Sequence, residues 1–358
     1  MELRLDDLAN VIGGIVLGDG SQTVSNALPL QDATEGHITM LDSVNHIARF
    51  IQSSATAAIA SNQLSQAIFE QSQKPVIAVP DLHEAFVQAI KCLRPSTADV
   101  YQGIDSRAIV DSTAKIAGDV YLGANATVGR NCVVSTGCRI HSGVHLMEDC
   151  FVGEDCEIFP GCVLYPGTIL GKRVMLHAGV VLGAHGFGYK LRNGRHERTA
   201  QLGWVEIEND VEVGANTTID RGTYGPTRIG EGTKLDNLIQ IGHNTHVGKH
   251  NLMCAQVGVA GSSSTGDFVV LGGQVGVSDH THVGDHCLAA AQSGIARSLE
   301  SHSKVMGTPA IPSRESTQVW ILSQRLPEMK KQLKELASSI AAIQAQLASP
   351  IEQRSKAA

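Results

Sequence analysis

Two groups of histidines in the second half of the chain carry residue types that acid–base chemistry needs. The first group is His243, His246 and His250, and the second is His280 and His282. A neutral imidazole accepts a proton near neutral pH, so one well-placed histidine can act as a general base. Imidazoles also bind zinc where three of them converge. The elements that carry these histidines decide between the two chemistries.

A six-residue period organises this part of the chain. From Ile104 to Leu182 every sixth residue is Ile, Leu or Val, and the period returns at Ile229 and runs to Val283 with a slip at Thr265. This period fits neither an α-helix nor an alternating strand. It is typical of a β-solenoid in which three short strands make one coil of about 18 residues. We predict that the aliphatic residue of each hexad points inward and that a small residue four places later fills a corner.

The small positions of the hexads account for most of the cysteines. Their spacings of 6 and 12 residues match the coil and differ from the C-x-x-C spacing of zinc and redox sites. We therefore predict that they are reduced and serve as buried packing. Glycines that directly follow a hexad aliphatic, such as Gly123, Gly129 and Gly153, are expected to permit the sharp turns. The cysteines concerned are Cys132, Cys138, Cys150, Cys156, Cys162 and Cys287.

The coil also predicts where the histidines point. His243 lies two places after an inward isoleucine and should project outward, whereas His246 and His250 should lie on other faces, so we predict no metal site. His280 follows 37 residues later, two coils and one place on, which puts it roughly 10 Å along the axis from His243. One extended substrate could reach both. Asp236 or Asn237, on the preceding hexad, is a candidate to orient His243.

Two further features flank the histidines. The hexad breaks at 184–204, and the inserted loop carries several basic residues, which favours an active-site wall or a subunit contact. The stretch 287–294 is almost entirely small, and small side chains on successive coils would leave a groove for an acyl chain, with Gly294 at its floor. The basic residues of the loop are Lys190, Arg192, Arg195 and Arg198.

The two ends of the chain lack the hexad. Residues 1–100 are predicted to form a small α/β domain, with a strand at 76–79 and a helix at 83–93 capped by Asp81. Residues 101–310 form the solenoid. Residues 311–358 carry a heptad seam and form a helix, with Pro327 in its first turn or at a break before it. This helix either lies on the solenoid or self-associates, and we favour a trimer. The seam consists of Leu322, Leu326, Met329, Leu333, Leu336, Ile340, Ile343 and Leu347.

Composition excludes several classes of protein. The 358 residues are 42% hydrophobic but only 4% aromatic, with 37 glycines and a net charge of −7. The apolar content argues against disorder, and the mild acidity argues against nucleic acid as a partner. No long apolar run predicts a transmembrane segment, and the first residues do not resemble a signal peptide, so a cytoplasmic location is expected.

Beyond the hexads, several motifs resemble one family over nearly the whole chain. The family is the bacterial UDP-3-O-(3-hydroxyacyl)glucosamine N-acyltransferases, which act in lipid A biosynthesis. The motifs are Gly186-Phe-Gly-Tyr189, Thr218-Ile-Asp-Arg-Gly222, Asp236-Asn-Leu-Ile-Gln-Ile-Gly-His-Asn244, Val259-Ala-Gly-Ser262, Gly272-Gly-Gln-Val-Gly276 and Gly307-Thr-Pro-Ala-Ile-Pro312.

The resemblance implies a mainly β fold and a reaction. The fold would be a left-handed parallel β-helix with an N-terminal uridine-binding α/β domain and a C-terminal helical extension, assembled as a homotrimer. An (R)-3-hydroxyacyl group would move from acyl carrier protein to the 2-amine of the acylated UDP-glucosamine. His243 would be the general base, and His280 would stabilise the oxyanion or hold the acyl hydroxyl. Gln240 and Asn244 would bind substrate. No cofactor belongs to the chain itself, because the carrier protein brings the 4′-phosphopantetheine.

One stretch departs from the family pattern. The family has an F-x-x-N-x-K-Y pattern that holds the uracil, and this chain has Met40, Ser43 and His46 at the corresponding places. Sulfur–aromatic contact with Met40 remains available, and Phe50 is an alternative stacking partner.

The acidic carrier protein requires local basic clusters. Arg297, Lys304 and Arg314 are the candidates, with Lys330, Lys331 and Lys334 as alternates. Two other hypotheses remain beside the N-acyltransferase. One is a related solenoid acyltransferase that uses another UDP-amino sugar or acyl-CoA, and the other is a non-catalytic or metal-dependent solenoid.

Overall fold

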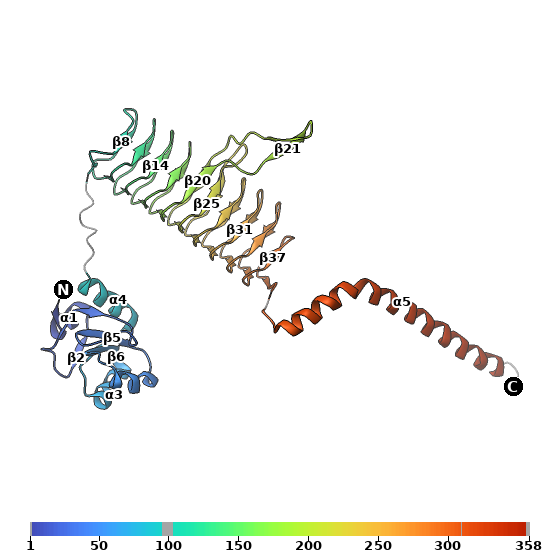
Figure 1. Ribbon diagram of the computed structural model, residues 1–358, viewed down its shortest axis with the longest axis horizontal. Helices are drawn as coiled ribbons and strands as arrows, with labels where there is room; N and C mark the ends of the chain where they lie inside the picture. The colour runs from blue at the N-terminus through green and yellow to red at the C-terminus, as the bar shows by residue number, and fades with distance from the viewer. Residues whose placement is uncertain (1, 95–102, 309, 356–358) are drawn as a thin grey trace. The chain divides into compact units, whose positions relative to one another are not determined.

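The computed structural model describes residues 2–94, 103–308 and 310–355, and the chain divides into two compact units, residues 1–102 and 103–358 (Figure 1). Among the described residues, no helix combines the length and apolar character needed to cross a membrane.

The first unit is an α/β domain, as predicted. A mostly parallel sheet has the order β2-β7-β6-β5-β4, with β2 antiparallel to β7. Asp81 accepts hydrogen bonds from the backbone N–H groups of His83 and Glu84, both at 3.1 Å, and so caps α4 as expected. The elements are β1 (Leu3–Arg4), α1 (Leu5–Ile12), β2 (Ile15–Leu17), β3 (Thr23–Val24), β4 (Asn26–Ala27), β5 (His37–Leu41), η1 (Val44–His46), α2 (Ile47–Gln52), β6 (Ala57–Ser61), α3 (Asn62–Ser72), β7 (Val76–Val79) and α4 (Leu82–Leu93).

The second unit contains a left-handed parallel β-helix whose coils stack along one axis (Figure 1). Each regular coil contributes one short strand to each of three parallel sheets, and the paired residues lie 18 apart, as Leu122 and Ile140 do. The predicted 18-residue coil is therefore confirmed.

The three sheets are the faces of the prism. The first consists of β10 (Tyr121–Leu122), β13 (Arg139–Ile140), β16 (Glu157–Ile158), β19 (Met175–Leu176), β24 (Glu212–Val213), β27 (Lys234–Leu235), β30 (Leu252–Met253), β33 (Val270–Leu271), β36 (Leu288–Ala289) and β38 (Lys304–Val305). The second consists of β8 (Ile109–Val110), β11 (Thr127–Val128), β14 (His145–Leu146), β17 (Val163–Leu164), β20 (Val181–Ala184), β25 (Thr218–Asp220), β28 (Gln240–Ile241), β31 (Gly258–Val259), β34 (Gly276–Val277) and β37 (Gly294–Ile295). The third consists of β9 (Lys115–Ile116), β12 (Val133–Val134), β15 (Phe151–Val152), β18 (Ile169–Leu170), β23 (Val205–Ile207), β26 (Thr227–Ile229), β29 (His246–Val247), β32 (Ser264–Thr265) and β35 (His282–Val283).

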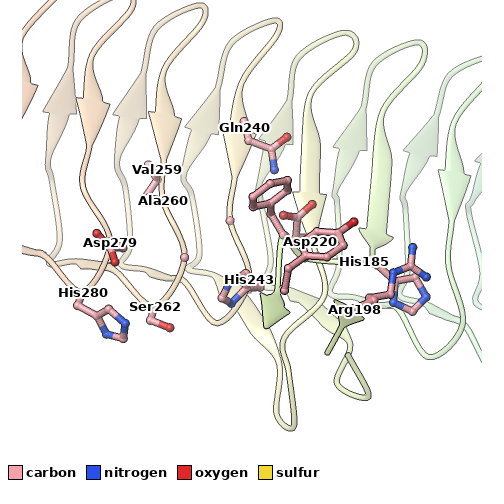
Figure 2. Close-up of a pocket in the computed structure, with 15 residues that line it drawn as sticks. His185, Arg198, Asp220, Gln240, His243, Val259, Ala260, Ser262, Asp279 and His280 are labelled. Carbon is pink, nitrogen blue, oxygen red and sulfur yellow. The ribbon is translucent and has the colours of Figure 1, made fainter. Parts of the chain in front are cut away.

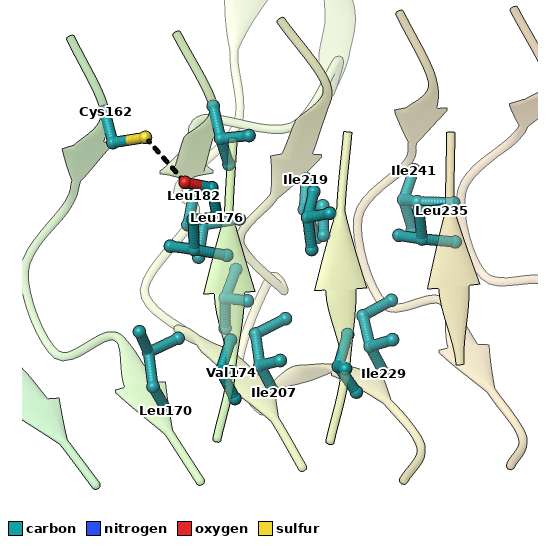
Figure 3. Close-up of a cluster of buried hydrophobic side chains, with 14 of the residues drawn as sticks. Cys162, Leu170, Val174, Leu176, Leu182, Ile207, Ile219, Ile229, Leu235 and Ile241 are labelled. Atoms are coloured by element: carbon teal, nitrogen blue, oxygen red, sulfur yellow. Dashed lines mark hydrogen bonds between the residues drawn. The ribbon is translucent and has the colours of Figure 1, made fainter. Parts of the chain in front are cut away.

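The core of the prism follows the hexad pattern. Leu170, Leu176 and Leu182, from three different faces, are all fully buried (Figure 3). The six cysteines at small positions are buried and form no disulfide with one another, which confirms their packing role. Several thiols also donate to a carbonyl of the next coil, such as Cys132 Sγ to Met147 O at 2.8 Å.

The glycines that follow hexad aliphatics were predicted to permit sharp turns, and the structure gives them a different role. Gly123, Gly129 and Gly153 do not adopt a positive φ. A Cβ on Gly123 would instead lie 2.5 Å from the backbone nitrogen of Ser142 on the next coil. These glycines therefore permit the close approach of successive coils, whereas left-handed corner positions are taken by residues such as Asn125 (φ 58°).

Two features interrupt or follow the prism. The hairpin of β21 (Tyr189–Arg192) and β22 (Arg195–Arg198) is inserted between β20 and β23 and projects from the stack (Figure 1). Helix α5 spans Ser313–Ser355. The expectation that Pro327 lies in the first turn or at a break is wrong, because the helix begins fourteen residues earlier. The ribbon bends in its first half (Figure 1), as a proline inside a helix causes.

Candidate active site

One pocket of about 660 Å³ brings three of the sequence candidates together (Figure 2). His243, His280 and Gln240 all line it, and the base of the inserted hairpin forms one wall. His280 occupies a corner at φ 53°, in register with Asn244 two coils earlier. The pocket therefore combines three imidazoles, of His185, His243 and His280, with an amide and a wall from the inserted hairpin.

Two glycines hold the ring of His243 in place. A Cβ on Gly186 would lie 2.5 Å from His243 Cβ, and a Cβ on Gly261 would lie 2.7 Å from both Cε1 and Nε2 of the ring. Both distances are shorter than any real Cβ contact, so the ring fits only because neither neighbour has a side chain. The glycines of two of the motifs thus form the slot that positions the candidate base.

Asn244 contacts the ring directly. Its Nδ2 lies 3.1 Å from His243 Nδ1, and its Oδ1 accepts the backbone N–H of Thr223 at 2.6 Å. Because the oxygen is held by Thr223, the amide nitrogen faces the ring, and an amide nitrogen can only donate. In this arrangement Nδ1 of His243 accepts, and the neutral ring carries its hydrogen on Nε2.

Asp236 and Asn237 do not orient His243, contrary to expectation. Asp236 accepts the backbone N–H groups of Asn237 at 2.7 Å and of Ala255 at 2.9 Å, and Asn237 Oδ1 accepts that of Ala215 at 2.7 Å. Both side chains line a separate pocket of about 640 Å³ on another face. Their local backbone bonds hold them there, and Asn244 contacts the ring instead.

Asp220 is a pocket residue that the sequence reasoning did not select. It ends β25, lines the pocket and is only 9% exposed. Burial raises the pKa of its carboxyl to about 6, and a hydrogen bond from Gln240 opposes the rise. The sequence signals were its place in the Thr218–Gly222 motif and its charge on a coil next to His243, to which no role was assigned.

A basic and aromatic wall lies beside Asp220. Burial lowers the pKa of His185, and the cations Arg198 and Arg221 lower it further. Phe187 is 86% exposed and packs edge-on against Tyr189, with ring centroids 5.1 Å apart. Of the basic loop residues, Arg198 is the one that lines this pocket (Figure 2).

The remaining substrate candidates lie in two places. Gly294 is exposed, and a Cβ on it would meet nothing within 4 Å. It is in register with Gly276, Gly258 and the pocket residue Gln240, so an open column of glycines leads away from the pocket along the second sheet. Not all of the small stretch faces this groove, because Ala289 is buried in the core.

The uridine candidates lie in the first unit. Met40 is half-buried at the end of β5, Ser43 caps η1 by accepting the N–H of Asn45 at 3.2 Å, and His46 Nδ1 lies 3.0 Å from Asp42 Oδ1. The alternative that Phe50 stacks on the base is wrong. Phe50 is fully buried, and Lys74 Nζ lies 5.0 Å from its ring centroid.

The carrier-docking candidates are exposed. Arg297 and Lys304 lie on the last coils of the prism and Arg314 in the first turn of α5. Of the alternates, Lys331 Nζ lies 3.9 Å from Glu335 Oε1 on the same helix.

Comparisons with known proteins identify similar sequences and solved structures. A family model described as bacterial transferase hexapeptide (six repeats) matches residues 149–184. A UDP-3-O-acylglucosamine N-acyltransferase of Rhodopirellula baltica is 50% identical over 342 residues, covering 94% of this chain and 88% of the relative. One from Methylacidiphilum infernorum is 47% identical over 331 residues, 92% of this chain and 93% of the relative. A solved UDP-N-acetylglucosamine O-acyltransferase from Moraxella catarrhalis is 26% identical, with a TM-score of 0.45, over 57% of this chain and 72% of the other.

Proposed function

Because the chain belongs to the UDP-3-O-acylglucosamine N-acyltransferase family, we propose that it moves an (R)-3-hydroxyacyl group from acyl carrier protein to the 2-amine of UDP-3-O-(3-hydroxyacyl)-glucosamine. The enzyme is an acyltransferase of lipid A biosynthesis. The observation that carries the proposal is the pocket in which His243, held between two glycines, lies beside Gln240 and His280.

His243 is the general base of this proposal. An amine that attacks a thioester loses a proton, and one well-placed base contributes about 10²–10⁴ in rate. Uptake at Nε2 requires the ring hydrogen to sit on Nδ1. Asn244 then has to accept this hydrogen through Oδ1, which costs its bond to the backbone N–H of Thr223. The transfer needs no covalent intermediate on the enzyme.

The other residues of the proposal each contact a different part of the substrates. His280 donates to the developing oxyanion or to the acyl hydroxyl, since donors at such a position typically supply the largest part of acyl-transfer catalysis. The acyl chain lies along the column of Gly258, Gly276 and Gly294. In the first unit, Met40, Ser43 and His46 hold the uracil, and the exposed cations Arg297, Lys304 and Arg314 attract the acidic carrier protein.

A donor assay tests the proposal. Purified wild-type enzyme is given UDP-3-O-acylglucosamine with either 3-hydroxyacyl carrier protein or the same acyl group on coenzyme A, and amide product is measured. We expect turnover with the carrier protein and a loss of at least 10²-fold in His243→Ala. Exclusive use of acyl-coenzyme A would contradict the proposed carrier-protein donor. Full activity of His243→Ala would contradict the proposed role of His243 as the base. His302→Ala, which changes a histidine on the last coils outside the pocket, is the matched control.

A further inference from the structure

Asp220 is a buried carboxylate in the pocket that the reaction described so far does not use. It is 9% exposed, and Gln240 is the hydrogen-bonding side chain that stabilises its charged form. Among the described residues, no Lys, Arg or His forms an ion pair with it, although Arg198 and His185 line the same pocket. A buried carboxylate without a cationic partner has a high free-energy cost unless a bound ligand supplies the opposite charge.

The negative charge of Asp220 limits which chemical groups of the substrates can bind beside it. A carboxylate repels the developing thioester oxyanion and the diphosphate of a sugar nucleotide. The one cationic group in the proposed reaction is the acceptor amine in its ammonium form. The inference that follows rests on the proposed N-acyl transfer, because only that reaction brings an ammonium to the pocket.

We infer that Asp220 binds the acceptor ammonium and takes its first proton, and that His243 takes the second. The proton balance of the reaction gives both groups a proton to take. An ammonium has three N–H bonds and the amide product has one, so two protons leave the nitrogen.

The two proton transfers occur before and after the C–N bond forms. One N–H bond of the ammonium breaks, and its proton moves to the Asp220 carboxylate. The freed lone pair forms the C–N bond as the carbonyl π electrons move to oxygen. His243 then removes a proton from the nitrogen of the tetrahedral intermediate. The electron pair on oxygen then re-forms the C=O bond as the C–S bond breaks, the thiolate leaves and receives the proton held by His243, and Asp220 releases its own proton to water.

The groups around Asp220 suit this division. His185 and Arg198 face it from the wall, Arg221 follows it in the chain, and His243 faces it from the next coil. Arg221 is held away, because its Nη2 donates to Pro166 O at 2.7 Å. Asp279 and His280 line the far end of the pocket and are exposed. Among the described residues, Asp220 is therefore the buried acid that shares a pocket with the candidate base.

A binding comparison tests the inference. Affinity is measured by calorimetry for the amino-sugar nucleotide and for its analogue with a hydroxyl in place of the 2-amine. Hydrogen bonds to charged groups imply that wild-type enzyme binds the amine about 10–100-fold more tightly at pH 7.5. This preference should shrink as the pH falls through about 6 and Asp220 becomes protonated. In Asp220→Asn the two affinities should become equal within about two-fold at every pH.

Controls separate the possible failures. Asp279→Asn makes the same change at an exposed carboxylate of the pocket and should keep the preference for the amine. If Asp220→Asn keeps it too, or if the wild-type preference does not change between pH 5 and 7.5, the inference is overturned. The wild-type titration decides the matter even if the variant does not fold. If wild-type enzyme forms no amide with any donor, the proposed function itself fails.

Discussion

At the scale of single residues, the site depends on glycines without side chains as much as on the histidine that they surround. His243 lies in a slot between Gly186 and Gly261, and no other residue type leaves room for its ring. Asn244 then fixes one ring nitrogen. A histidine held on both faces has a fixed ring position, which acid–base catalysis needs, and the amide of Asn244 has only to turn over for the ring to accept a proton at Nε2.

Gly261→Ala tests this slot. The added methyl would lie 2.7 Å from the ring of His243, so the ring must shift while the backbone, which does not need a positive φ here, stays in place. A displacement of about 1 Å can cost about 10²-fold in rate. We expect kcat for amide formation to fall by about that factor with little change in melting temperature. Gly118→Ala, where a Cβ meets nothing within 4 Å, should leave kcat as it is; equal kcat in both variants would contradict the slot.

Asp220 gives the fold a pH dependence of its own. Its pKa is about 6 in the folded protein against 3.8 in a free side chain, so the folded state binds an extra proton between these values. The contribution of Asp220 to stability is therefore greatest below about pH 4 and is lost as the pH rises through 6. We expect Asp220→Asn to raise the free energy of unfolding by about 1–2 kcal/mol at pH 7.5 and to have little effect near pH 4. Denaturant titrations at the two pH values measure this, and a variant destabilised at pH 7.5 would contradict it.

Sequence reasoning reached part of this site for a clear reason. The hexad register fixes the coil and face of each residue, so spacing alone was enough to relate His243 to His280 as neighbours along one surface. Register does not show which side chain is cut off from water. Asp220 is buried and pairs with Ala184 at a register shift beside the inserted hairpin, where the hexad pattern does not apply. Asp236 was chosen as the partner of His243 by spacing, but backbone N–H groups of the next coil hold it elsewhere.

At the scale of elements, the prism supplies a rigid, repetitive surface on which small changes create function. Each coil repeats the same three strands, so removing side chains at one position of successive coils makes a groove. Gly258, Gly276 and Gly294 do this on the second sheet, next to the pocket. The sequence located Gly294 through a run of small residues. The run of small residues did not show which of its members face the groove and which face the core, because Ala289 in the same run packs inward.

Gly294→Met tests whether this column holds the acyl chain. The side chain can be accommodated without disturbing the coil, because a Cβ at Gly294 meets nothing within 4 Å. It would fill the floor of the groove, so we expect the preferred acyl chain to become shorter by several carbons, measured by competition among carrier proteins loaded with different chains. Leu288→Met, on another face, adds no bulk to the column and should keep the wild-type preference. An unchanged preference in Gly294→Met would remove the column from the acyl site.

At the scale of the whole molecule, α5 is the element whose apolar seam is exposed in the single chain. The heptad seam was evident from spacing alone, and the helix is longer than expected because it continues through Pro327. Seam residues of α5 are exposed, with Leu333 at 66% and Ile340 at 53%. Leu347 was also assigned to the seam, and its side chain lies outside the described residues. A continuous apolar seam of this kind is stabilised when it packs against another helix.

Charge placed on the seam should therefore weaken assembly. We propose that the protein is a homotrimer and that α5 contributes to its interface, so Leu333→Glu with Ile340→Glu should lower the molar mass measured by light scattering at micromolar concentration. Burying two carboxylates in a helix interface without partners costs several kcal/mol, which is large against the stability of such contacts. Gln324→Glu with Ser338→Glu adds the same two charges on the opposite face of the heptad and should leave the mass at that of the wild type. If both double variants keep the wild-type mass, the prism faces hold the subunits together and the seam of α5 is free to bind another partner, for which the basic residues Lys330 and Lys334 beside it would favour an acidic one.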